Sequence, residues 1–173
     1  METVKLDVFG DIGSAIKAIE QYQKYLQTKA DRLVSELSKV GLNVARAYFA
    51  SAVYDGMNDV TVSLDDSRQA RAVIRATGTT VLFIEFGTGV YYSSPTHPYA
   101  SQYGFTRGSY GKGNGSKNTW GYFGVGGTNG HYVASTKKGE LYTTHGNPAN
   151  MSMYQTARVL ESMIGAKARE VFG

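Results

Sequence analysis

Apolar residues recur at steps of three and four over the first third of the chain. They stand at Ile16, Ile19, Tyr22, Leu26, Ala30, Leu33, Leu37, Val40 and Val44. This spacing, sustained over many turns, is typical of an amphipathic helix. Asp11 or Ser14 is a suitable residue to cap its start, and the helix is expected to end near Tyr54.

The length of this helix is itself informative. About 40 residues at a rise of 1.5 Å make a rod of roughly 60 Å. A compact domain of this chain length has a diameter of only roughly 40 Å. The helix is therefore expected to break or bend, with Gly41 the natural place, or to pack on another subunit. We expect both a bend near Gly41 and an oligomer.

Alternating segments follow the helix. Val60–Leu64 and Arg68–Thr77 alternate apolar and polar residues, and Asp65-Asp66-Ser67 between them has the composition of a turn. Thr80–Gly89 then reads Thr-Val-Leu-Phe-Ile-Glu-Phe-Gly-Thr-Gly. It is predicted as a central strand, apolar on both faces, that ends in a sharp turn at its two glycines. Three antiparallel strands packed on a helix indicate an α+β fold.

One carboxylate, Glu85, interrupts the apolar run. A buried charge is costly unless it finds hydrogen-bond donors. Arg71 or Arg75 on the neighbouring predicted strand would supply them if the register placed either beside Glu85. The residue is then either one half of a structural ion pair, which we favour, or a functional acid.

Residues 90–146 form a long excursion rich in Gly, Ser, Asn and Tyr. Ten glycines fall between positions 104 and 130, and aromatic residues punctuate the whole segment. Its five basic residues against Glu140 account for the entire formal net charge of +4. Short strands are predicted at Thr119–Val125 and Tyr132–Ser135. A loop of this length in a compact domain is usually functional or disordered, and we expect it to order on contact with a partner.

The chain is predicted to close with a second helix. Asn147 is a good N-cap and Pro148 suits the first helical position. An apolar stripe then runs through Met153, Ala157, Leu160, Ile164, Ala168 and Val171. Residues 3–9 are expected to form a short strand or a frayed arm. The whole of 1–173 is expected to be a single domain, with the excursion within it.

Several kinds of chemistry have no support in the sequence. The chain has no cysteine, which excludes disulfides and Cys-type zinc sites. The glycines at 124–129 and 111–112 do not match a dinucleotide fingerprint or a P-loop. His97, His131 and His145 have no metal-ligand spacing, and there is no Gly-x-Ser-x-Gly sequence. No apolar run approaches the roughly 20 residues of a membrane span, and the N-terminus does not resemble a signal peptide. We expect no cofactor, no metal, no enzyme activity and no membrane contact.

Four short sequence words, taken in order, resemble the tail-completion family of long-tailed bacteriophages, whose members are also described as minor tail or neck proteins. The words are Glu85-Phe86-Gly87-Thr88-Gly89, His97-Pro98, Trp120-Gly121-Tyr122 and Thr144-His145-Gly146-Asn147-Pro148-Ala149 with Met153-Tyr154. The likeness extends from about residue 14 to residue 172. This chain has Asn150-Met151 where the family usually has Pro-Phe.

The resemblance implies a non-enzymatic structural protein of the virion at the head–tail junction. Copies would form an oligomeric ring, six-fold in the family, that completes the tail and joins it to the head connector. The implied partners are other copies, the head connector or stopper proteins, the tail-tube or terminator proteins, and DNA in the channel. The implied location is the virion neck or tail, assembled in the host cytoplasm. Whether the chain is a tail terminator or an adjacent completion factor stays open.

Under this hypothesis Glu85, Phe86, Gly87, Thr88 and Gly89 form the turn after the strand. Gly146, Asn147 and Pro148 open the last helix. The residues expected to contact partners are His97, Pro98, Arg107, Lys112, Lys117, Trp120, Tyr122, Lys137 and Lys138.

Two alternatives come from other functional classes. The basic, aromatic loop 90–146 could bind DNA without reading its sequence, because Lys and Arg attract phosphates and tyrosines stack on bases. A hydrolase using Glu85 and a loop histidine is the other.

Overall fold

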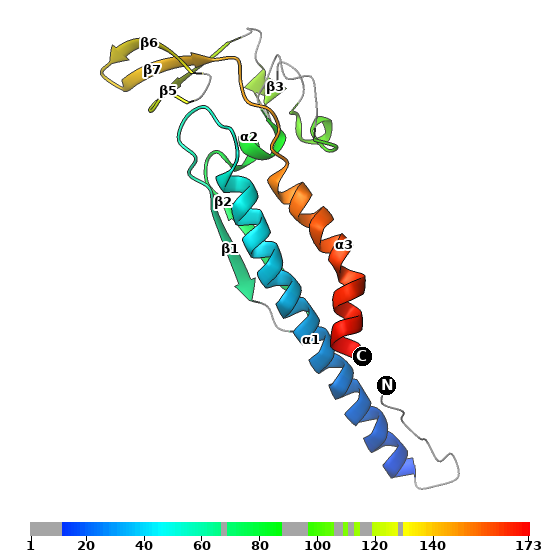
Figure 1. The fold of residues 1–173 in the computed structure, drawn as a ribbon. Coiled ribbons are helices and arrows are strands. Elements are labelled where there is room, and N and C mark those ends of the chain that lie inside the picture. The colour runs from blue at the N-terminus through cyan, green and yellow to red at the C-terminus, as the bar shows by residue number, and fades with distance from the viewer. Residues whose placement is uncertain are drawn as a thin grey trace. The chain divides into compact units, whose positions relative to one another are not determined.

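The computed structural model describes residues 12–66, 69–87, 97–105, 109–110, 113–114, 119–127 and 130–173 (Figure 1). Several sequence predictions therefore lie outside the described residues. They are the strand or arm at 3–9, the turn at Ser67, and the roles of Thr88, Gly89, Arg107, Lys112 and Lys117.

The described elements make an α+β fold, as the sequence predicted. The β1–β2 pair and the β3–β4 pair are two-stranded sheets, and β5, β7 and β6 form a three-stranded antiparallel sheet in that order. The elements are α1 (Ile12–Ala50), β1 (Thr61–Asp66), β2 (Ala72–Thr77), α2 (Val81–Phe86), the 3-10 turn η1 (Ser101–Tyr103), β3 (Ser109–Tyr110), β4 (Gly113–Asn114), β5 (Trp120–Phe123), β6 (His131–Thr136), β7 (Gly139–Thr144) and α3 (Ser152–Phe172).

The chain divides into two compact units. The first comprises residues 1–42, 63–75 and 158–173, and the second comprises 43–62 and 76–157. Each unit gathers segments that are far apart in the sequence. The expectation that residues 1–173 behave as a single domain stays a prediction.

In the first unit, α1 lies antiparallel to α3. Lys29 Nζ donates a hydrogen bond to the carbonyl oxygen of Val171 at 2.7 Å, and Lys167 Nζ lies 3.5 Å from Glu36 Oε2. As the residue number rises along α1, the number of the contacting residue on α3 falls, so the two helices run in opposite directions. Lys29 marks the level at which α3 ends, and α1 continues from there toward Ile12.

Gly41 serves close packing in this unit. A Cβ added there would lie 2.5 Å from Ile74 Cδ1 and 2.9 Å from Leu160 Cδ1. The glycine therefore lets α1 approach both β2 and α3, which offsets its helix-propensity cost of about 1 kcal/mol. The helix continues through Gly41 from Ile12 to Ala50, so it does not break there.

The predicted third strand is wrong, because residues 81–86 form the short helix α2 instead. The helical spacing brings Phe83 and Phe86 to the same neighbour, Phe105, with ring centroids 6.3 and 4.9 Å away. Ile84 and Glu85 are buried, whereas the exposed fraction of Leu82 is 55%. Gly87 ends the helix at φ 76° and donates its N–H to the carbonyl oxygen of Phe83.

The predicted strands at Thr119–Val125 and Tyr132–Ser135 are confirmed as β5 and β6. The sequence did not predict β7, which lies between them and pairs with both. Tyr142 at its centre faces Tyr122 on β5 and Tyr132 on β6, with ring centroids 5.7 Å away in each case. This tyrosine trio explains part of the aromatic content of the excursion.

The last helix begins at Ser152 and not at Pro148, so the predicted N-cap at Asn147 is wrong. The side chain of Asn147 instead accepts a hydrogen bond from the backbone N–H of Asp55 at 2.8 Å, and it is buried. Positive φ angles at Gly146 and Met151, 90° and 54°, keep the intervening segment out of the helix.

Candidate functional site

The site begins with the residues that fix α2 in place. The carboxylate of Asp59 accepts hydrogen bonds from the backbone N–H and the hydroxyl of both Thr79 and Thr80, at 2.5 to 3.0 Å. Asp59 thus holds the two residues that immediately precede α2, although it lies some twenty positions earlier in the chain. The hydroxyl bond from Thr80, followed by the bonds from Thr79, holds the pKa of Asp59 well below its usual range.

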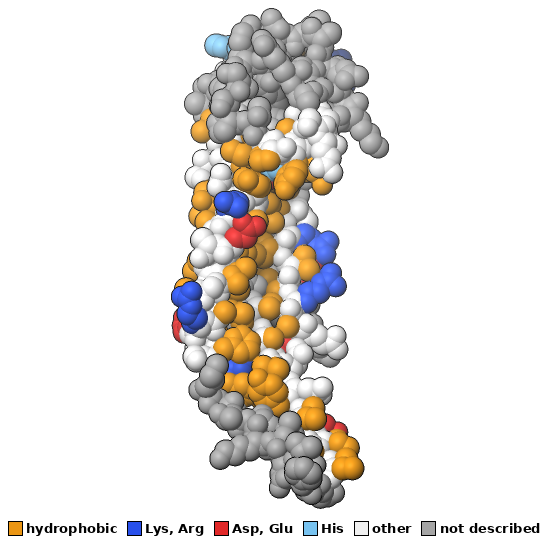
Figure 2. All heavy atoms as spheres, turned by 90° about the vertical axis from the view of Figure 1, so that its right-hand side faces the viewer, with side chains coloured by type: hydrophobic (Ala, Val, Ile, Leu, Met, Phe, Trp, Pro, Cys, Tyr) orange, Lys and Arg blue, Asp and Glu red, His pale blue; other side chains and the backbone are white. Residues whose placement is uncertain are grey.

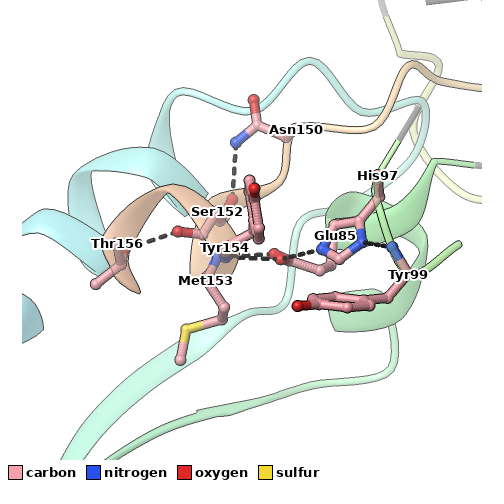
Figure 3. Close-up of polar contacts among 8 residues, drawn as sticks. All are labelled: Glu85, His97, Tyr99, Asn150, Ser152, Met153, Tyr154 and Thr156. Carbon is pink, nitrogen blue, oxygen red and sulfur yellow. Dashed lines mark hydrogen bonds and ion pairs between the residues drawn. The ribbon is translucent and has the colours of Figure 1, made fainter. Parts of the chain in front are cut away.

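Glu85 is the centre of the site (Figure 3). Its exposed fraction is 6%. Glu85 Oε2 accepts the backbone N–H of Met153 at 2.8 Å, and Oε1 accepts that of Tyr154 at 2.9 Å. These two N–H groups belong to the first turn of α3 and have no partner within the helix. The carboxylate of Glu85, which belongs to α2, therefore caps the N-terminus of α3.

The charge of this carboxylate suits its position. The N-terminus of a helix carries a partial positive charge, and it stabilises anions placed against its free N–H groups. With 21 residues, α3 is long enough to carry this partial charge at its N-terminus. The predicted pairing of Glu85 with Arg71 or Arg75 is wrong, because the donors to the carboxylate are the two backbone N–H groups and a histidine. Arg75 pairs with Asp65 at 2.8 Å in an exposed salt bridge.

His97 provides the third hydrogen-bond partner of the Glu85 carboxylate. The backbone N–H of Tyr99 donates to His97 Nδ1 at 3.1 Å, so that nitrogen is an acceptor. The proton then resides on Nε2, which lies 3.2 Å from Glu85 Oε1. His97 thus donates one hydrogen bond to the carboxylate through Nε2. Its exposed fraction is 5%.

Aromatic rings enclose this histidine. The ring centroid of Phe86 lies 4.4 Å from that of His97, and the centroid of Tyr154 lies 5.3 Å away. Phe86 also stacks on Phe105, which is buried. Tyr99 is about half exposed, so the aromatic shell reaches the surface on its side. The shell excludes water from the polar contacts and strengthens them.

Backbone contacts join the end of α2 to the start of α3 in the same direction, because α2 again provides the acceptors and the segment that leads into α3 provides the N–H donors. Asn150 and Met151 donate their N–H groups to the carbonyl oxygens of Ile84 and Glu85, at 2.9 and 3.1 Å. A methyl group added at Gly87 would lie 2.6 Å from the backbone nitrogen of Ala149. The end of α2 therefore accepts the N–H groups of the two residues before α3 through its backbone, and those of the first turn of α3 through the Glu85 side chain. We call the set Ile84, Glu85, Gly87, His97 and Asn150–Tyr154 the α2–α3 junction.

A second buried polar cluster lies in the same unit. The hydroxyl of Thr144 donates to the carboxylate of Asp55 and accepts the N–H of Gly146. The hydroxyl of Tyr122 accepts the N–H of Gly127 at 2.9 Å. A Cβ added at Gly127 would lie 2.4 Å from Asp55 Cα, so this glycine allows two backbone segments to meet. The cluster joins the three-stranded sheet to the segment after α1.

At the α2–α3 junction, the Glu85 carboxylate serves as an anion that holds the fold together. Glu85 already accepts three hydrogen bonds, and both nitrogens of His97 are engaged. Within the described residues, no three His, Asp or Glu side chains are grouped to hold a metal ion. His131 in β6 and His145 after β7 are exposed and do not join His97. Neither residue has a described contact with Glu85.

The structure gathers some of the sequence-predicted site residues and leaves others apart. Glu85, Phe86, Gly87 and His97 meet at the α2–α3 junction, whereas Gly146 and Asn147 belong to the second cluster. The remaining described residues are spread over the unit. Pro98 is exposed beside His97, Pro148 is half-buried, Trp120 contributes the first backbone residue of β5, Tyr122 stacks on Tyr142, and Lys137 and Lys138 are exposed in the β6–β7 turn.

Sequence reasoning missed Asp59, Asp55, Thr144 and Asn150 as site residues. Each makes its contacts with a segment tens of residues away, so no local spacing points to the partner. One local signal was present for α2. Thr79-Thr80 precedes an apolar run, and threonine is a common residue just before a helix.

Comparisons with known proteins give no match: no family model, no curated protein and no solved structure is similar to the chain. Among the described residues, none of the helices has the length and apolar character needed to cross a membrane.

Proposed function

We propose that this chain is a structural virion protein of a tailed bacteriophage. In this proposal it completes the tail and joins it to the head connector as a subunit of an oligomeric ring. Two lines of support are the sequence resemblance and the positions, in the structure, of the short motifs that carry it. Glu85-Phe86-Gly87, His97 and Met153-Tyr154 are separated by up to 69 positions, yet they meet in one hydrogen-bonded junction.

The character of that junction also favours a structural role. Glu85 is the charged residue that a hydrolase hypothesis would use, and three N–H donors occupy it. A general base must be within hydrogen-bond reach of a substrate proton, and this carboxylate is buried. The residues of the resemblance thus hold two helices together, which is the task of a scaffold.

A phage genome that encodes this chain provides the direct test. Removal of the gene should leave filled heads and separate tails that lack completion and are not joined to heads, as seen by negative-stain electron microscopy of lysates. Expression of the wild-type chain in trans should restore joined particles. Normal joined particles without the protein would refute the proposal.

A second candidate, sequence-independent DNA binding, is favoured by one observation. Lys137 and Lys138 are adjacent and exposed in the β6–β7 turn, and Tyr132 on the neighbouring strand is 57% exposed. Phosphate contacts by such lysines weaken steeply with salt. Neutralising both lysines should reduce the salt dependence of DNA binding. Binding that the double substitution leaves unchanged would dispose of a role for this turn.

A further inference from the structure

The first part of α1 exposes a row of apolar side chains. The exposed fractions are 76% for Ile12, 51% for Ile16, 47% for Ile19 and 38% for Leu26. Hydrophobic side chains are visible at the surface of this part of α1, at the lower end of Figure 2. Their spacing of four, three and seven residues places them on one stripe of the helix. We call these four residues the α1 stripe.

The α1 stripe continues a face that is covered further along the same helix. From Ala30 onward the residues at the same spacing, Leu33, Leu37 and Val40, are half-buried, and Gly41 is packed against Leu160 of α3. The cover stops where α3 ends, at the level of Lys29. The sequence thus keeps one apolar seam of period 3.5 along α1, although α3 covers only its later part. Such a seam is typical of helix–helix packing.

The uncovered part of α1 has weak stability of its own. Its first turn contains Gly13 and Ser14 and no acidic residue that would complement the helix dipole. Most helical stability in proteins comes from packing of the apolar face, and α3 does not pack on this part of α1. A second helix lying on the α1 stripe would supply that packing.

The flanks of the α1 stripe fit another copy of the same helix. The charged residues between Ile12 and Thr28 are Lys17, Glu20 and Lys24, and none of them lies in the stripe. Positive and negative side chains therefore both flank the stripe, so α1 of a second copy can place a lysine against Glu20. Identical stripes that cover each other leave neither exposed.

We infer that the α1 stripe is a self-association surface whose occupant is α1 of a second copy of this chain. This inference does not depend on the proposed function.

Sedimentation velocity of the full chain over a wide range of concentrations tests the inference. Ile19→Lys places a charge in the stripe, and Gln21→Lys places the same charge on the opposite side of the helix as a matched control. Ile19 is half exposed within a chain, so the substitution leaves the fold intact, and circular dichroism checks this. The wild type should self-associate, Ile19→Lys should weaken association at least about tenfold, and Gln21→Lys should change it by less than about twofold.

Three results would overturn the inference. The wild type could be monomeric throughout the concentration range. Ile19→Lys could associate as the wild type does, in which case any oligomer uses another surface. A variant lacking residues 1–11 could associate while the full chain does not, which would mean that the chain's own N-terminal residues occupy the stripe.

Discussion

At the scale of single residues, Glu85 and His97 form a polar centre that is fully satisfied inside an aromatic shell. The carboxylate takes three hydrogen bonds, and two of them come from the N-terminal turn of α3. The sequence identified Glu85 as a buried charge that needs donors. It could not identify the donors, because they are backbone groups at Met153 and Tyr154 and a histidine 12 positions away.

Substitution of Glu85 by Gln should destabilise the protein. The amide keeps the shape of the carboxylate, but it loses the charge and turns an NH2 group toward N–H donors. Leaving buried donors unsatisfied costs about 1–3 kcal/mol, and urea denaturation followed by circular dichroism would measure the loss. Glu161→Gln is the control, since that exposed side chain pairs with Arg158 at the surface and should change stability by less than about 0.5 kcal/mol. Equal stability of Glu85→Gln and wild type would contradict the assigned role.

Asp59 predicts a pH dependence of stability. Its folded-state pKa is lowered mainly by the hydroxyls of Thr80 and Thr79, whereas the unfolded-state pKa is about 3.9. Its contribution is therefore complete above the unfolded value and is lost as the pH falls from about 4 toward the folded-state pKa. Asp59→Asn should be less stable than wild type at pH 7, with a gap that narrows below about pH 4. Urea unfolding at a series of pH values gives the gap, and a gap of constant size would argue against this role of Asp59.

At the scale of elements, segments with a clear apolar period were predictable. The helix in α1, the strands β1 and β2 and the body of α3 follow from apolar periodicity, and short strands were also predicted at the positions of β5 and β6. The run 81–86 has no decisive period over six residues, and Val, Phe and Ile favour a strand. Contacts made elsewhere decide its conformation, with Asp59 at its start and Phe105 against its rings. The start of α3 moved for the same reason, because Asp55 engages the expected cap Asn147.

The approach of α2 to the segment before α3 requires a glycine at position 87. Gly87→Ala would place its Cβ 2.6 Å from the backbone nitrogen of Ala149, at a φ of 76°. Gly139→Ala is a matched control, since Gly139 has a φ of 113° and open space around it. The control should lose about 1–3 kcal/mol from backbone strain, and Gly87→Ala should lose clearly more because backbone atoms cannot move aside. Thermal or urea unfolding compares the two variants. Equal losses would show that the close approach does not limit this position.

At the scale of the whole molecule, the sequence suggested an oligomer because α1 is too long for a compact domain of this size. The structure shows which part of α1 is uncovered. The exposed apolar residues Ile12, Ile16 and Ile19 lie on the part of α1 that extends beyond the end of α3. The sequence could not separate covered from uncovered parts of the seam. That distinction depends on the length and placement of α3, which its own apolar stripe does not fix.

We propose that this chain is a building block whose surfaces are completed by other copies and by neighbouring virion proteins. Native mass spectrometry of the purified chain, alone and mixed with head-connector and tail-tube proteins from the same genome, measures its assembly directly. We expect a closed oligomer of defined mass, six copies if the family pattern holds, either alone or on mixing. A chain that stays monomeric in both conditions would contradict it.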